Sequence, residues 1–231
     1  VARASLKTRD YSSSAMGDRL HQTGRVEARE LAAGIPNDLS IPGVEVFHRQ
    51  VFHQRYRGYF AEFGREGEAV LGRIGLWPRQ WATARMFAGT SKGFHIHPPH
   101  IPDGTAPEAW FKRLFVDEPE NFRLRPYDRE QWDVMFFIQG ICEMYLIDER
   151  AGMPRNKIRF IIEGDDLRGE NNVGVVIPAG VAHAIRSAAS QDLIMVYGTS
   201  TTFAMENEGR IAHRVESPDM PADWETYWNQ A

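Results

Sequence analysis

His95 and His97 are the residues of this chain whose types and spacing most directly suggest chemistry. They lie in the run Gly93-Phe94-His95-Ile96-His97, which a proline pair ends. Because alternate residues of a strand face the same side of a sheet, both imidazoles would point the same way. Such a pair can bind a metal ion, transfer protons, or hydrogen-bond to the backbone at a solvated barrel mouth. His100 follows the prolines, so we expect it at the mouth or at an interface.

Two distant positions extend this pair to a set of four. His183 comes three residues after the glycine of Pro178-Ala179-Gly180, and Asp133 comes seven residues before Gly140. Together with the histidine pair, these spacings resemble the two motifs of the cupin superfamily. Cupins are small jelly-roll barrels that usually place three histidines and one carboxylate around a metal ion.

The cupin resemblance implies that His95, His97, Asp133 and His183 bind one divalent transition metal. Three imidazoles and a carboxylate suit divalent Fe, Mn, Ni, Cu or Zn and leave open positions for a substrate. Asp133 replaces the more usual glutamate and is one carbon shorter. The alternative for Asp133 is an aspartate that faces solvent at the start of its strand.

Short apolar runs separated by turns must position these four residues. We predict strands at 44–47, 59–63, 81–87, 132–138, 141–147, 158–162, 173–177, 182–186 and 193–197. This pattern is typical of an all-β sandwich or barrel and not of a parallel α/β sheet. The cupin resemblance narrows the fold to a double-stranded β-helix, the jelly-roll cupin barrel.

The remaining segments are organised around one barrel. We predict an N-terminal arm at 1–40, with a helix from Asp18 to Ala33 that packs on a partner, and a single cupin domain at 41–231. The alternative for the start of the arm is disorder. Residues 98–130 are rich in prolines and charges, so we expect a long insertion over the barrel mouth. A short helix is expected over Pro221–Trp228 at the C-terminal end.

Composition excludes several classes of function. The chain has 231 residues, a net charge of −4 and a pI near 6.1, so it lacks the basic character of a nucleic-acid-binding protein. Its single cysteine, Cys142, excludes an internal disulfide framework and fits a reducing compartment. No apolar run is long enough to span a membrane, and the first residues do not form a secretory signal. We therefore expect a cytoplasmic protein that binds no membrane.

Four stretches between about residues 51 and 211 resemble one cupin family, the dTDP-4-dehydrorhamnose 3,5-epimerases. The first is Val51–Glu62, with its Arg-Gly-Tyr-Phe-Ala-Glu signature, and the second is Lys92–His95. The third is Ile177–His183, written Ile-Pro-Ala-Gly-Val-Ala-His. The fourth is Tyr197–Phe203, followed by Glu208-Gly209 and Ile211.

The epimerase resemblance implies a role for two of the histidines. His95 matches the base that removes protons beside the 4-keto group of the sugar, a task for which imidazole has a suitable pKa. His183 would help to hold the substrate or a developing enolate. The tyrosine pair that supplies the family's general acid is replaced by Thr202 and Phe203.

Two further departures from the epimerase pattern involve predicted metal ligands. A lysine of the family aligns with Asp133, and the glutamine that follows the family's base aligns with His97. Both changes move the pocket toward a metal-binding cupin, whereas the epimerase pattern itself is metal-free. His97 is therefore the residue that best separates the two interpretations.

Three more residues are candidates for binding a substrate. Lys92 could bind a phosphate or carboxylate at the mouth, or lie on the surface. Arg85, on a strand predicted to face inward, could bind an anionic substrate or form a surface ion pair. Tyr197 is a tyrosine that the epimerase family shares.

We therefore predict a diverged relative of the 3,5-epimerases that acts on a small carbonyl- or sugar-type substrate. In this interpretation the metal held by three histidines and one aspartate acts as a Lewis acid. A homodimer formed through the N-terminal strands is expected from the family. The alternatives are a metal-free sugar-nucleotide epimerase with His95 as base, a metal-dependent cupin oxygenase, and a non-catalytic ligand-binding cupin.

Overall fold

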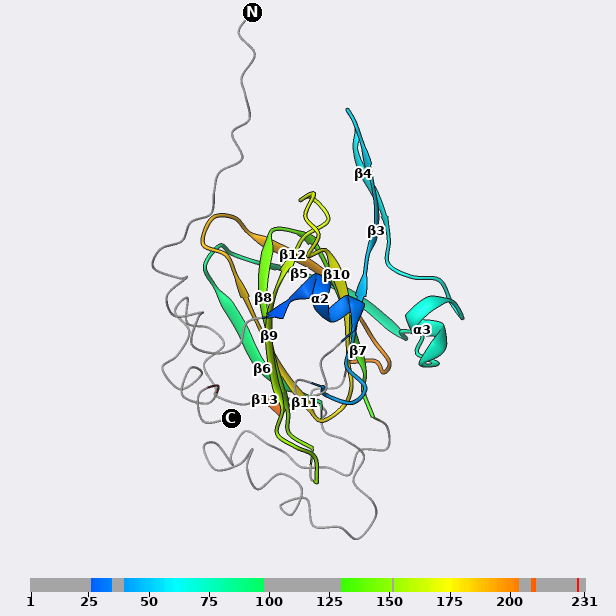
Figure 1. Ribbon diagram of the computed structural model, residues 1–231, viewed down its shortest axis with the longest axis vertical. Helices are drawn as coiled ribbons and strands as arrows, with labels where there is room; N and C mark the ends of the chain where they lie inside the picture. Colours follow the sequence, from blue (N-terminus) through cyan, green and yellow to red (C-terminus); the bar gives the residue numbers. More distant parts are fainter. Residues whose placement is uncertain are drawn as a thin grey trace, which may run out of the picture.

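The computed structural model describes residues 26–34, 40–97, 130–150, 152–203, 209–210 and 228. Its centre is formed by two facing β-sheets, with a long hairpin that projects away from them (Figure 1). The first sheet contains, in spatial order, β1 (Val26–Glu27), β9 (Lys157–Glu163), β8 (Ile141–Asp148), β11 (Val181–Ser187), β6 (Ser91–Ile96) and β13 (Gly209–Arg210). The second contains β2 (Glu45–His48), β10 (Val173–Ile177), β7 (Asp133–Gln139), β12 (Leu193–Thr199) and β5 (Gln80–Met86).

Two strands and two helices of the described part of the chain lie outside these sheets. The projecting hairpin pairs β3 (Gln50–Gln54) with β4 (Gly58–Glu62), and the helices are α2 (Ala28–Ala33) and α3 (Ala69–Arg73). Among the residues that the structure describes, neither helix is long and apolar enough to cross a membrane.

The predicted all-β jelly-roll fold is confirmed. Every strand predicted from the sequence is present, with ends that shift by at most about two residues. The separation of β3 from β4, and the helix α3, were not predicted from the sequence. Each of these is short or polar, so its local pattern is weak.

Side chains alternate between the two faces of each strand, and those on the inner faces fill the space between the sheets. Along β7, Met135 and Phe137 face the interior, whereas Val134 and Phe136 belong to a second apolar cluster on the outer side. Because Asp133 alternates with Val134, it faces the interior as well. The solvent-facing alternative for Asp133 is therefore excluded, and its side chain is almost completely buried.

The outer face of the second sheet carries a buried ion pair at the base of the hairpin. Arg49 Nη2 lies 2.8 Å from Asp165 Oδ2, and both side chains are inaccessible to solvent. The guanidinium also lies over the rings of Phe63 and Phe136, at 5.0 and 4.7 Å from their centroids. These contacts compensate for the desolvation of both charges and anchor the hairpin to the barrel.

The N-terminal arm differs from the prediction in its described part. Val26 and Glu27 form β1, parallel to β9, and helix α2 begins only at Ala28, so the predicted helix from Asp18 to Ala33 is wrong over Val26 and Glu27. Ala28 and Leu31 are buried in the core between the sheets. This part of the arm therefore packs on its own barrel, because pairing with β9 outweighs local helix propensity.

Several predictions fall on residues outside the described part of the chain. They concern residues 1–25 of the arm, nearly all of the insertion at 98–130, and the C-terminal helix apart from Trp228. Trp228 itself packs edge-on against Tyr145, with ring centroids 5.0 Å apart, on the outer face of the first sheet.

Candidate functional site

A local irregularity between β6 and β11 determines which way the first histidine points. His183 lies opposite His95, but Ile185 lies opposite Lys92, so β6 contains one extra residue between the two pairs. Directly opposed residues share a face of the sheet. Because His183 and Ile185 both face the interior, Lys92 and His95 are both turned inward by this bulge.

Gly93 makes the bulge possible. Its φ is +128°, and a Cβ atom at this position would lie only 2.6 Å from the Cα atom of Ala184. No residue with a side chain fits such a close approach without displacing β11. The glycine therefore serves to bring the β6 backbone against β11 and to turn His95 toward His183.

Three of the four predicted metal ligands meet between the two sheets. His97, Asp133 and His183 each offer a ligand atom, and these atoms all lie within 4.8 Å of one another. Asp133 Oδ2 is 3.0 Å from His97 Nε2 and 3.8 Å from His183 Nε2. His183 comes from β11 and Asp133 from β7 in the other sheet, whereas His97 directly follows the end of β6. His97, Asp133 and His183 are only 8%, 3% and 5% exposed.

His95 lies beside this group but does not belong to it. Its ring centroid is 5.9 Å from that of His183, and the rings are tilted by 58°. The ring of His97 is equally far from His183, on the side of the carboxylate. The structure therefore distinguishes His95 from the three-residue group, whereas the sequence spacing treated all four residues alike.

The surroundings place Asp133 and His183 in the protonation states that a metal ligand needs. Burial opposes ionisation of Asp133, but interactions with His97, His183 and Gln131 outweigh it and lower the pKa of Asp133 to about 2. Burial also lowers the pKa of His183 to about 4, although the charge of Asp133 opposes this. At neutral pH the site thus contains a carboxylate and a neutral His183.

The tautomer of His183 also fits a ligand. Its Nδ1 lies 3.4 Å from the carbonyl oxygen of Val181, which can accept only a proton carried on Nδ1. The lone pair of Nε2 is then directed at Asp133 and His97. Two imidazoles and one carboxylate, buried and close together, suit a divalent transition metal.

The lowered pKa of His183 predicts how stability depends on pH. Between its ordinary pKa of 6.5 and its folded value of about 4, the unfolded chain takes up a proton that the folded chain excludes. The free energy of unfolding should therefore fall as the pH falls through this window, by roughly 1–3 kcal/mol. Asp133 acts in a lower window, between 3.8 and about 2.

Urea unfolding in the presence of a chelator, followed between about pH 7 and pH 4, measures this dependence. The His183→Gln variant serves as the reference, because its side chain does not titrate there. We expect the parent protein to lose more stability than the variant over this range. Parallel curves for the two proteins would show that His183 titrates normally in the folded state.

The three predicted substrate-binding residues fall in different places. Lys92 faces the interior, three residues before His95. Tyr197 also faces the interior, where it packs against the core from β12. Arg85 lies on the outer face of β5 and donates from Nε to Asp192 Oδ2 at 2.7 Å. Of the two alternatives for Arg85, the structure therefore has the surface ion pair, and the predicted inward orientation is wrong.

The positions that replace the epimerase tyrosine pair are exposed. Thr202 lies at the surface, and the side chain of Phe203 is 60% exposed. The backbone N–H of Phe203 donates to Gln80 Oε1 at 2.7 Å. Neither residue places a hydroxyl group or ring among the buried histidines.

Two polar residues at the site were not singled out from the sequence. Gln131 Nε2 lies 2.9 Å from Asp133 Oδ1 and 3.1 Å from His97 Nε2. Thr201 Oγ1 donates to Gln131 Oε1 at 2.7 Å. Gln131 could have been found, because it precedes Asp133 by two residues and so shares its face. Thr201 could not, since only the pairing of β7 with β12 brings it near.

Comparisons with known proteins agree with the barrel. No protein-family model matches the chain. The spore coat polysaccharide biosynthesis protein SpsL of Bacillus subtilis is 24% identical over 190 residues, which cover 82% of this chain and 91% of that protein.

Solved structures of sugar epimerases superimpose on the barrel. The dTDP-6-deoxy-D-glucose-3,5-epimerase RmlC of Legionella pneumophila, in complex with dTDP-4-keto-L-rhamnose, matches with a TM-score of 0.53 and 18% identity over 75% of each chain. The 3'-monoepimerase ChmJ of Streptomyces bikiniensis, in complex with dTDP-quinovose, matches with a TM-score of 0.53 and 22% identity over 74% of this chain and 71% of that chain. The protein therefore has the cupin-type barrel fold of these sugar epimerases, at a sequence identity of 18% and 22% to the two structures.

Proposed function

We propose that the protein is an isomerase-type enzyme that moves a proton beside a carbonyl group of a sugar-type substrate and uses a divalent metal ion. The observation that carries this proposal is the convergence of His97, Asp133 and His183 to within 4.8 Å, next to a separate imidazole, His95. The first three residues form a donor set for a metal, and His95 lies beside them as the candidate base.

His95 would act as the general base. An imidazole has an unperturbed pKa near neutrality, so it can accept a proton and return it within one catalytic cycle. The bulge at Gly93 turns this ring into the barrel interior, where a substrate carbon could approach it. Both structural neighbours named above bind dTDP-linked sugars, which supports a sugar-type substrate.

His97, Asp133 and His183 would hold the metal ion. The chemistry that such an ion supplies when bound is Lewis-acid stabilisation of oxyanion charge on a substrate carbonyl. Neither Thr202 nor Phe203 carries a phenol group that could supply a proton for this purpose. Asp133 brings a negative charge into the interior, and His183 stays neutral beside it, so neither residue attracts a diphosphate.

Two measurements on the parent protein test the proposal. The first is the metal content after purification without a chelator or a nickel column, for which we expect nearly one equivalent of a transition metal. The second is the exchange of solvent deuterium into a 4-keto-6-deoxyhexose nucleotide and into simpler keto sugars. We expect exchange at the carbon beside the carbonyl, and loss of this exchange when the metal is removed.

The same measurements separate the alternatives. Exchange by a protein that contains no metal would overturn the metal proposal in favour of a metal-free epimerase. Metal without exchange, but with oxygen uptake, would indicate an oxygenase. Metal with neither activity would indicate a ligand-binding cupin.

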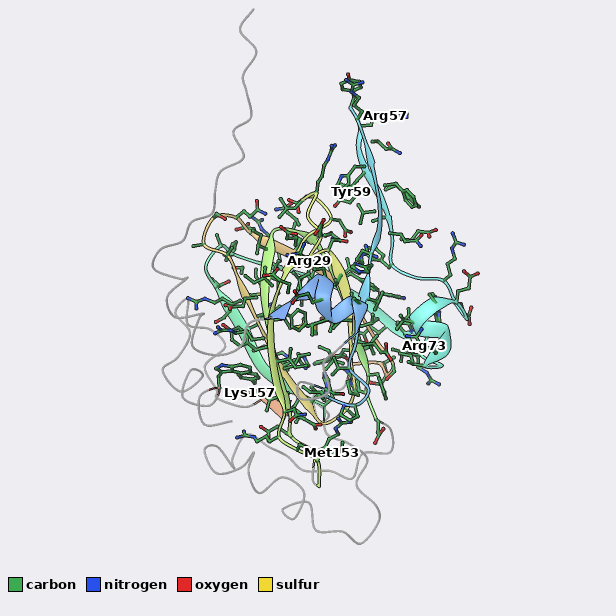
Figure 2. All side chains as sticks on the ribbon, in the orientation of Figure 1. Arg29, Arg57, Tyr59, Arg73, Met153 and Lys157 are labelled. Carbon is green, nitrogen blue, oxygen red and sulfur yellow. The ribbon has the colours of Figure 1, made fainter. Side chains whose placement is uncertain are left out.

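We also propose that two chains associate through the β3–β4 hairpin. This hairpin forms a sheet of two strands and extends beyond the barrel, with Arg57 at its tip (Figure 2). Phe52 and Phe60 lie opposite each other on one face and are 56% and 54% exposed. Exposed aromatic residues on a strand with open edges favour an interface. Light scattering should give the mass of a dimer for the parent and of a monomer for Phe60→Ser.

A further inference from the structure

Gln131 connects the metal-binding group to the end of a neighbouring strand. Trp132 N–H donates to Ser200 Oγ at 2.8 Å, and Ser200 N–H donates to the carbonyl oxygen of Trp132 at 2.9 Å. These bonds extend the contact between β7 and β12 beyond the paired residues Asp133 and Thr199. Gln131 and Thr201 therefore lie side by side at the same end of the barrel as the buried carboxylate.

Asp133 and Thr201 together fix the orientation of the Gln131 amide. The Thr201 hydroxyl donates to Gln131 Oε1 at 2.7 Å, so the NH₂ group faces the other way, toward Asp133 and His97. The opposite orientation would place Oε1 against a carboxylate oxygen, and two acceptors at that distance repel each other. Thr201 is itself held by Thr199, whose Oγ1 donates to the carbonyl oxygen of Thr201 at 2.6 Å.

The two carboxylate oxygens of Asp133 have different partners. Oδ1 accepts a hydrogen bond from Gln131 Nε2 at 2.9 Å. Oδ2 faces the two imidazoles, at 3.0 Å from His97 Nε2 and 3.8 Å from His183 Nε2. One oxygen is thus occupied by a neutral donor, and the other is directed at the place where the ligand atoms converge.

We propose that Gln131, oriented by Thr201, is a positioning residue that makes Asp133 a ligand through Oδ2 alone. Hydrogen bonds to ligating carboxylates fix their orientation and strengthen metal binding. This positioning matters more for an aspartate than for a glutamate, because an aspartate has one fewer side-chain torsion with which to adjust the position of its carboxylate. The inference rests on the proposed metal site for its consequence, but the hydrogen-bond chain can be tested without metal.

The main experiment measures the binding of Co²⁺ to the full chain by competition with a chelating dye. Gln131→Met, which keeps the length and removes the polar atoms, should weaken Co²⁺ binding by about 10- to 100-fold. It should also change the visible absorption of bound Co²⁺, because the carboxylate can then rotate. Thr201→Val should weaken Co²⁺ binding by a smaller factor. In the double variant it should weaken binding little beyond the effect of Gln131→Met alone.

Matched controls use residues far from the site. The first control is Gln191→Met; Gln191 lies in the turn before β12, at the end of that strand opposite to Thr199. The second is Thr83→Val, which removes a hydroxyl group that donates to the carbonyl oxygen of Met195 on the second sheet. Both should keep the parent affinity and spectrum. Gln131→Met with the affinity and spectrum of the parent would overturn the inference.

A metal-free measurement separates this inference from the proposed function. The ¹³Cγ resonance of Asp133, assigned by its loss in Asp133→Asn, is compared in chelator-treated parent and Gln131→Met at neutral pH. We expect a shift, because the Oδ1 hydrogen bond is removed. If the parent binds no Co²⁺, the metal proposal fails, and this resonance alone decides: a shift supports the positioning of Asp133, and an unchanged resonance refutes it.

Discussion

Replacing His95 with glutamine is expected to slow solvent deuterium exchange into the substrate by about 10²- to 10⁴-fold, the usual contribution of a general base. Glutamine keeps a similar shape and a polar end but cannot accept a proton at neutral pH. Metal content should stay at the parent level, because His95 lies outside the group formed by His97, Asp133 and His183. The combination of lost exchange and retained metal is the distinctive result.

His48→Gln provides the control for this experiment. His48 is an exposed histidine at the end of β2, and its replacement should leave both exchange and metal content unchanged. If His95→Gln loses the metal together with the exchange, His95 would be a fourth ligand, as the cupin spacing suggested. If His95→Gln exchanges deuterium at the parent rate, another residue is the base.

Replacing Asp133 or His97 with alanine is expected to abolish stoichiometric metal binding. Asp133 supplies the carboxylate charge of the group, and each substitution removes one of the three donors that cluster among the described residues. The affinity should fall by more than the 10- to 100-fold typical of residues outside the coordination shell, that is by more than about 100-fold. Metal analysis of protein purified without a chelator, followed by Co²⁺ titration, measures this loss.

The control for this pair is Asp192→Ala. Asp192 is an aspartate that pairs with Arg85 on the outer face, so its loss should not affect the metal. Retention of one equivalent of metal by either Asp133→Ala or His97→Ala would exclude the proposed ligand set. Loss of metal should also reduce deuterium exchange in both variants, since the oxyanion then lacks its stabilising charge.

The sequence by itself determined much of the barrel. The apolar run at 132–138, bounded by turns, predicted a strand there, and the structure then places Asp133 on the face opposite Val134 and Phe136. The motifs around His95 and His183 predicted the type of barrel, which the similarity of the solved epimerases confirms. These features depend on local periodicity and on turns, which a short stretch of sequence specifies.

The tertiary structure decided which of the predicted residues meet. Spacing assigned the same role to four ligand candidates, but the bulge at Gly93 and the convergence of the two sheets gather His97, Asp133 and His183 and leave His95 aside. The outward orientation of Arg85 has a similar cause, since a shift of one residue along a strand reverses its face.

Strand pairing also decided features that the sequence did not predict. Val26 and Glu27 form a strand because β9 offers them a partner, although their local pattern favours a helix. Thr201 contacts Gln131 because β7 and β12 are paired in the sheet, although these strands are far apart in the chain. The sequence thus determined where most of the strands lie. The register between strands, which is a non-local property, decided the geometry of the site.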